Sequence, residues 1–229
     1  MSATPDRAQV RRGRPSRGRA KLSRRRVLQS ALELVDAEGL DAVSMRRLAQ
    51  RLGVDPMSLY NHVDDKAAIL DGIAELMLES VDVIDPGHNV RQGLETVARN
   101  FRAAMLAHPR AAPVVLERRT PSPVALAPMQ VVLASMLASG IEAERAVSAF
   151  RAMLAFLVGA LMREVRDAPG SCATDPVEAH GRRRELEATG LPAIVATAPY
   201  ISTIDHQKEF EFGLAMLLES VMRLIPRGE

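Results

Sequence analysis

The stretch LGVDPMSLYNHVDDK, residues 52–66, determines how the chain folds. Asp55 and Pro56 predict a helix start, because an aspartate caps the free N–H groups of the first turn and a proline fits there without losing a hydrogen bond. Only Leu59 and Val63, four residues apart, are suited to anchor this helix in a core. A helix so short is marginal in water, so we expect neighbouring helices to hold it and an external partner to use its exposed side chains.

Three more helices are predicted around this stretch. The one just before it begins at Ser44, which can cap it, and ends at Gly53. The link 53–55 has the length of the turn in a helix-turn-helix, with a glycine where the chain must bend. An earlier helix is expected over residues 23–39, and a longer one follows the two aspartates near the end of the quoted stretch.

The rest of the chain also predicts helices. Apolar residues recur at helical spacing in 90–108, 129–140, 146–165 and 205–225, and no segment alternates as a strand would. Prolines punctuate 113–128, and 167–190 is polar and rich in Pro and Gly, so the first is expected to interrupt the helices and the second to be a loop. We therefore expect an all-α fold with a disordered basic arm (1–21), a three-helix helix-turn-helix domain (22–68) and a larger helical domain (69–229).

The composition argues against several classes of protein. Aromatic residues make up 3% of the chain and Trp is absent, which suits a helical core of Leu, Val, Ala and Met. A single cysteine, Cys172, excludes an internal disulfide or a cysteine zinc site and fits a reducing, cytoplasmic location. The five histidines are scattered and no catalytic motif occurs, so neither an enzyme nor a cofactor nor a metal site is predicted.

The longest uncharged apolar run covers residues 152–162. As a helix it would be about 16 Å long, roughly half of the hydrocarbon thickness of a bilayer. We therefore expect it to be buried within the protein rather than to span a membrane.

Charge is distributed unevenly along the chain. Residues 1–26 hold ten Lys or Arg and one acidic residue, whereas the remainder holds 20 basic and 27 acidic residues. Such a basic arm is typical of proteins that contact nucleic acid. Arg12 and Arg14, in the segment Arg-Gly-Arg-Pro, form an extended cationic element that fits an A·T-rich minor groove. The alternative is a solvated tail without a partner.

The segment GLDAVSMRRLAQRLGVDPMSLYNHVDDKAAIL, residues 39–70, resembles the DNA-binding domain of the TetR family of transcriptional repressors. It contains a Gly-Leu opening, a second helix of the form LAxxLGV, and a recognition helix LYxHV followed by a lysine. The C-terminal half is similar to the tetracycline-repressor branch in the segments FRAAMLAHPRAAPVVL (101–116), AFLVGALMREV (155–165) and FEFGLAMLLESV (210–221).

This resemblance implies a homodimer that binds a palindromic double-stranded DNA operator and holds a small-molecule effector in its C-terminal domain. The helices 146–165 and 205–225 would form the dimer interface, where we expect Leu161 and Leu217 to lie. In a helix-turn-helix the second helix enters the major groove. Carried over position by position, the resemblance assigns base or groove contacts to Met45, Arg46, Pro56, Met57, Ser58 and Asn61, and phosphate contacts to Tyr60, His62 and Lys66.

Tetracycline repressors bind their drug as a magnesium chelate, through two histidines, an asparagine, a threonine and a water-linked glutamate. The positions that match the first four are here Asp82, Val97, Val115 and Arg118, whereas Phe101 and Glu164 match the branch. A valine removes the direct protein ligand to magnesium, so the resemblance favours a different, largely apolar effector. It places the effector cavity among Phe101, Met105, Val115, Met129, Met153, Phe156 and Leu157, with Arg118 and Glu164 as polar anchors.

The sequence favours a ligand-responsive repressor but leaves two alternatives open. An activator of the same family would carry the same motifs. An architectural DNA-binding protein would use the basic arm and no effector, although the long helical segment beyond residue 69 favours an effector domain. The effector, the operator sequence and the regulated genes are not determined at this stage.

Overall fold

A computed structural model describes residues 22–82, 89–117, 122–167 and 175–226. Within these ranges the chain forms eleven α-helices and one short 3₁₀ helix, and no strand, which confirms the all-α class. The basic arm with Arg12 and Arg14, and also Arg118, lie outside the described residues.

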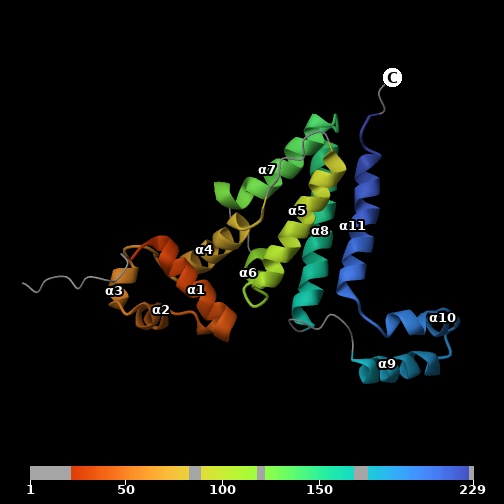
Figure 1. Cartoon of the computed structure of the whole chain (residues 1–229), viewed down its shortest axis with the longest axis horizontal. Coiled ribbons are helices and arrows are strands. Elements are labelled where there is room, and N and C mark those ends of the chain that lie inside the picture. Colours follow the sequence, from red (N-terminus) through yellow and green to blue (C-terminus); the bar gives the residue numbers. More distant parts are fainter. Residues whose placement is uncertain (1–21, 83–88, 118–121, 168–174, 227–229) are drawn as a thin grey trace, which may run out of the picture.

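The N-terminal part contains α1 (Arg24–Glu38), the 3₁₀ helix η1 (Leu40–Ala42), α2 (Met45–Leu52), α3 (Pro56–Leu59) and the start of α4 (Lys66–Glu79). Each α-helix begins where the sequence predicted, because a side-chain oxygen accepts a hydrogen bond from a backbone N–H of its first turn. The capping residues are Ser23, Ser44, Asp55 and Asp65. Figure 1 shows α2 and α3 side by side at the end of the molecule opposite α9–α11.

The larger part is an elongated helical bundle built from α5 (Val90–Ala107), α6 (Ala112–Glu117), α7 (Pro123–Ala138), α8 (Ala143–Arg166) and α11 (His206–Met222). Here α8 lies between α5 and α11 (Figure 1) and packs against both. The helix α4 contacts α1 on one side and α5, α6 and α7 on the other. It is therefore the element that joins the N-terminal helices to the bundle.

Two expectations about non-helical segments were wrong. Much of 113–128 is helical, because α6 begins at Ala112 and α7 begins at Pro123, where a proline fits the first turn. Pro128 lies inside α7 at the cost of one backbone hydrogen bond.

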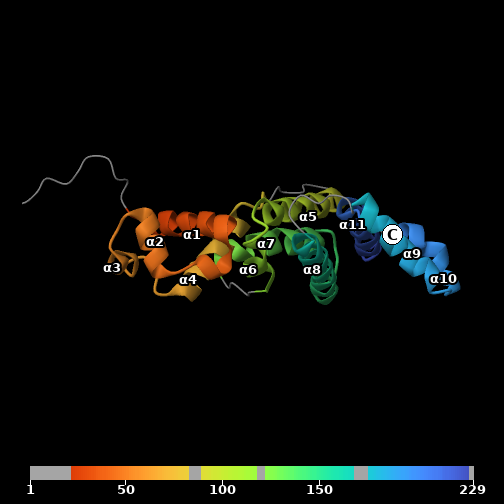
Figure 2. The same cartoon turned by 90° about the horizontal axis from the view of Figure 1, so that it is seen from below.

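Within 167–190, α9 (Pro176–Ala188) forms, capped by Asp175 and supported by an ion pair between Arg183 and Glu187. The sequence of α9 has no apolar stripe, and none of its residues is buried. Helical periodicity therefore could not predict it. It packs against α10 (Pro192–Ile201), and Figure 2 shows this pair extending away from the bundle.

The helix α8 is buried on one side in the single chain. Its buried residues recur at helical spacing and face the bundle: Ala146, Ala149, Met153, Leu157 and Leu161. Ala155, Gly159 and Met162, on another side, are exposed. By length and composition α8 is long and apolar enough to cross a membrane, the one such helix in the described ranges, and 22% of its most apolar window is buried in the single chain. The buried side packs on α5, α6, α7 and α11.

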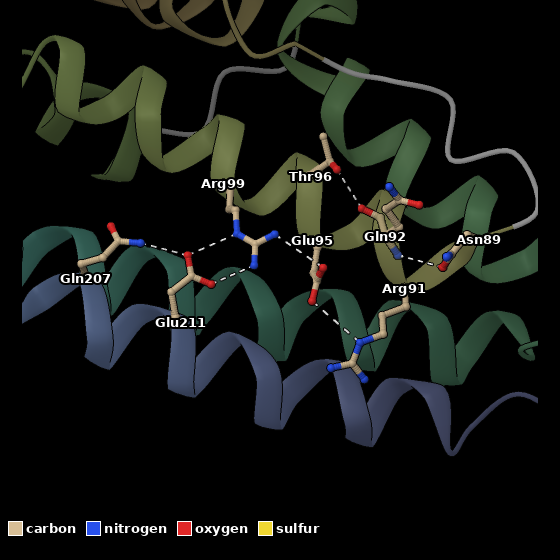
Figure 3. Close-up of polar contacts among 8 residues, drawn as sticks. All are labelled: Asn89, Arg91, Gln92, Glu95, Thr96, Arg99, Gln207 and Glu211. Atoms are coloured by element: carbon tan, nitrogen blue, oxygen red, sulfur yellow. Dashed lines mark hydrogen bonds and ion pairs between the residues drawn. The ribbon is translucent and has the colours of Figure 1, made fainter.

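An ion-pair cluster joins α5 to α11 (Figure 3). The side chain of Arg99 donates to Glu211 from Nε at 3.2 Å and from Nη2 at 2.8 Å. Gln207 Nε2 donates to the same carboxylate at 2.9 Å. The hydrogen bond from Arg99 is the main cause of a lowered pKa for Glu211.

Replacing this carboxylate, as in Glu211→Gln, is expected to remove a pH-dependent part of the stability. The pKa of Glu211 lies below its usual value of 4.5 in the folded protein. Its contribution is therefore present above the unfolded-state pKa and is lost as the pH falls through the folded-state pKa. At neutral pH the variant should be less stable than the wild type by about 0.2–1 kcal/mol, as for other exposed pairs, and the difference should disappear in acid. Urea denaturation at both pH values measures this, and an equal difference at both would contradict it.

Candidate DNA-binding surface and effector cavity

The surface formed by α2 and α3 exposes both polar and apolar side chains, while a few buried residues hold these helices in place. Leu59 is fully buried and Val63 nearly so, and they hold α3 and the following turn to the other helices. Gly53 has φ +64°, the left-handed conformation that ends α2 and turns the chain toward α3. Met57 is 71% exposed, so its side chain is open to a partner outside the core.

The predicted DNA contacts differ in how far they project from the protein. The exposed members are Arg46, Pro56, Met57, Tyr60, Asn61 and Lys66, and the half-buried members are Met45, Ser58 and His62. Met45 packs against the hydrophobic core, so its apolar stem supports α2. Eight of the nine described residues lie on α2, on α3 or directly after α3, and Lys66 begins α4. Six of the nine have side chains open to solvent.

The basic side chains of this region differ in their ion pairs. Four of them are paired: Arg24 with Glu75, Arg25 with Glu79, Arg47 with Glu38 and Arg51 with Glu33. Arg46 and Lys66 form no ion pair or hydrogen bond through their side chains with any described residue. These two cations are therefore the ones available to a phosphate or a base edge without first breaking an intramolecular pair.

A cavity of about 580 Å³ lies in the bundle between α4, α5, α6, α7 and α8. Its described walls are almost entirely apolar, including Phe101 of α5, Met129 of α7, and Phe150 and Met153 of α8. Leu78, near the C-terminal end of α4, also lines it. Volume and lining are in the range of small-molecule sites.

The cavity contains five of the predicted effector residues, Phe101, Val115, Met129, Met153 and Leu157. Met105 is fully buried in the core and does not line it. Phe156 faces α11 instead, where its ring stacks on Phe210 with centroids 5.9 Å apart. It also fills the space beside Gly213, where an added Cβ would lie 2.3 Å from the Phe156 ring.

Glu164, predicted as a polar anchor, is engaged elsewhere. Arg102 donates to its two oxygens at 2.9 and 2.6 Å, and the Arg102 guanidinium lies 4.9 Å from the centroid of the Phe210 ring. Both partners of this ion pair are largely buried. Glu164 therefore fastens α8 to α5 and does not line the cavity.

The corner between α5 and α6 is tied to the C-terminal end of α1. His108 Nδ1 lies 2.7 Å from Asp36 Oδ2, and Arg110 Nη1 donates to the carbonyls of Asp36 and Ala37 at 3.1 and 2.5 Å. A cation at this position satisfies carbonyls that the helix end leaves unpaired. Together with α4, this contact connects the helices around the cavity to those that carry the exposed surface.

Known protein families match both parts of the chain. Residues 27–73 match "Bacterial regulatory proteins, tetR family", and residues 85–224 match "Tetracyclin repressor-like, C-terminal domain". The chain belongs to the TetR family.

Individual relatives extend over nearly the whole length. The HTH-type transcriptional repressor DrrR1 of Streptomyces coeruleorubidus is 31% identical over 233 residues, which cover 94% of this chain and 84% of that protein. The class A tetracycline repressor of transposon 1721 in Escherichia coli is 30% identical and covers 91% of this chain and 95% of its own. Streptomyces coelicolor ActR in complex with actinorhodin superimposes with a TM-score of 0.80 at 29% identity, covering 91% of this chain and all of that one.

The described cavity walls of this TetR-family member offer few donors for a magnesium chelate. Val97 and Val115 line the cavity with hydrocarbon, and Glu117 is the one oxygen ligand that a described side chain offers there. Asp82 is exposed, and its backbone carbonyl accepts a hydrogen bond from Asn100. The described ranges also hold no group of three or more His, Cys, Asp or Glu residues placed to bind a metal ion. These walls fit an apolar guest better than a hydrated metal complex.

Several residues of the cavity were missed from the sequence. Phe150 shares a helical stripe with Met153 and Leu157, at positions i, i+3 and i+7, and this spacing could have identified it. Leu78 and Glu117 carry no such signal, because their position depends on how α4 and α6 pack against the bundle.

Proposed function

We propose that this protein is a transcriptional repressor that binds a palindromic operator as a homodimer and is released by a small, largely apolar effector. The observation that carries the proposal is the position of α4. Lys66 begins this helix beside the exposed α2–α3 surface, and Leu78 of the same helix lines the cavity. Leu78 follows Lys66 by twelve positions in the helix, about 18 Å along its axis, so one rigid element reaches both sites.

Release follows if the effector prefers one position of α4 over the position that suits DNA. The cavity wall includes Leu78 of α4 and Val115, Leu116 and Glu117 of α6, and α6 packs on α4. An occupied cavity would set the spacing of the two DNA-reading ends in a dimer. A hundredfold loss of operator affinity needs a coupling of about 2.7 kcal/mol, which burial of one hydrophobic ring system can supply.

The proposed dimer interface is the exposed apolar side of α8 and α11. Phe212 and Met216 of α11, four residues apart, are 69% and 57% exposed, and Gly159 and Met162 of α8 are also open to solvent. An apolar surface of this kind on a helical bundle suits a partner with the same surface. Leu161, expected at the interface from the sequence, is instead fully buried within the chain, and Leu217 is half-buried.

Arg46→Ala is expected to weaken operator binding by about 1–3 kcal/mol and to relax the preference at one base pair of each half-site. Arg46 is exposed and has no described partner, so its guanidinium can meet a base edge directly. The matched control is Arg47→Ala, because the neighbouring arginine is already paired with Glu38. Binding-site selection from random DNA measures both variants. An unchanged base preference in Arg46→Ala would show that Arg46 does not read the sequence.

The same selection on the wild type tests the function as a whole. It should yield a palindrome with half-sites in successive major grooves. When this site is placed in a promoter upstream of a reporter gene in bacterial cells, the protein should repress expression of the reporter. Activation of the reporter would identify the alternative of a TetR-like activator. Binding without a preferred sequence would favour an architectural protein.

A further inference from the structure

One ion pair bridges the helices on either side of the 3₁₀ helix. Glu38 is the last residue of α1, and Arg47 lies in the first turn of α2. Arg47 Nη2 donates to Glu38 Oε2 at 2.5 Å. The side chains of Arg47 and Glu38 are 45% and 46% exposed, so another charged group at this surface can reach both. Arg47 directly follows Arg46, which is a predicted contact to a base.

The carboxylate of Glu38 is placed to act on α2 rather than on its own helix. At the C-terminal end of α1 it lies beside carbonyl groups that already carry partial negative charge, which disfavours an anion there. The N-terminal end of α2 attracts anions instead, because its first N–H groups carry partial positive charge. Glu38 is thus an anion that binds to the first turn of α2 through Arg47.

A DNA phosphate would use the same groups of α2. With Arg46 at a base edge, the first turn of α2 would lie at the groove, which is bordered by phosphates. A guanidinium binds carboxylates and phosphates alike, through charge-assisted hydrogen bonds. The donors that Arg47 gives to Glu38 are lost to a phosphate, and the Glu38 carboxylate repels a second anion beside it. Glu38 and a phosphate therefore compete for Arg47.

We propose that Glu38 is an intramolecular substitute for a DNA phosphate, which holds Arg47 and so limits the sequence-independent part of the affinity for DNA. This inference rests on the proposed function and adds to it a residue that restrains phosphate contacts. Arg46, which has no ion pair or hydrogen bond to a described residue through its side chain, stays available to read a base. Because a phosphate contact strengthens binding to all sequences alike, Glu38 lowers the affinity for operator and non-operator DNA together.

The salt dependence of binding to a short DNA duplex of random sequence tests the inference. Each phosphate that a cation neutralises adds about 0.9 to the slope of log K against log salt. If Glu38→Gln frees Arg47 in both subunits of a dimer, the slope should steepen by about 1.8. The affinity at low salt should rise about fivefold, because neither subunit holds its arginine in an exposed ion pair. The base preference in selection from random DNA should stay that of the wild type.

Two matched variants separate this effect from a change in overall charge. Asp41→Asn removes one negative charge three residues from Glu38, from an exposed side chain with no ion pair or hydrogen bond to a described residue. It should change the slope much less than Glu38→Gln does. In an Arg47→Ala background, Glu38→Gln should have no more effect than Asp41→Asn, because the arginine that it would release is absent.

The outcomes distinguish this inference from the proposed function. An unchanged slope in Glu38→Gln, or a steeper slope that persists in the Arg47→Ala background, would overturn the inference and leave operator binding standing. A wild-type protein that binds neither the random duplex at low salt nor any selected sequence would contradict the proposed function together with the inference.

Discussion

Met216→Arg should give a folded monomer whose affinity for the palindromic operator is reduced at least about a hundredfold, or 2.7 kcal/mol. Met216 is exposed on α11 next to Phe212, so the single chain loses little packing by the change. In a two-fold dimer the same position occurs twice at one interface, so each substitution places two guanidinium groups on facing apolar surfaces. A monomer has one DNA-binding domain, so it contacts one half-site and loses the contacts to the other half of the palindrome.

Sedimentation equilibrium and helical circular dichroism distinguish this outcome from misfolding. Phe212→Arg should behave in the same way, since both residues lie on one side of α11. Val177→Arg is the control, because Val177 is exposed on α9, and it should leave the dimer and operator affinity intact. A wild-type protein that sediments as a well-folded monomer at micromolar concentration would rule out the proposed dimer.

Leu161→Glu, by contrast, should prevent stable folding. Leu161 is fully buried on the inner side of α8 and belongs to the hydrophobic core, which disfavours a carboxylate at this position. The loss of leucine packing is worth roughly 2–5 kcal/mol and burial of the charge adds to it, which together approach the whole stability of a typical domain, about 5–15 kcal/mol.

The adjacent residue provides the matched variant. Met162 is exposed on α8, so Met162→Glu should keep the wild-type helical signal while it weakens dimerisation, and its melting temperature should fall only by the part that dimerisation contributes. Thermal denaturation of the two variants side by side decides the point. If Leu161→Glu melted like the wild type, the assignment of this side of α8 to the core would be incorrect.

The N-terminal helices could be predicted closely from the sequence because their determinants are local. Ser44, Gly53 and Asp55 fix the two ends of α2 and the start of α3 through capping and turn geometry. The exposed side of α3 followed from the shortage of apolar residues around Leu59 and Val63. No contact with a distant segment was needed for either inference.

The cavity could be predicted only in part, because its walls depend on packing between distant helices. Periodicity identifies the apolar side chains of α8 but not which flank faces the cavity and which faces α11, so Phe156 was misplaced. Glu164 was misplaced for a similar reason, since its partner Arg102 lies 62 residues away in the sequence. Phe210 of α11 packs against Phe156 of α8 and Arg102 of α5. The pattern of any one helix does not show these contacts.

The central claim is that filling the apolar cavity releases the protein from DNA without a metal ion. Fluorescence anisotropy of a labelled operator, titrated with a ligand panel in the presence and absence of EDTA, tests it most directly. The panel should include small apolar compounds and tetracycline, and the cavity-filling variant Val132→Phe serves as control because Val132 lines the cavity and is nearly buried. We predict release by a small, largely apolar compound that is unaffected by EDTA and is lost in Val132→Phe with operator binding retained. Release by tetracycline that disappears on addition of EDTA would contradict the account.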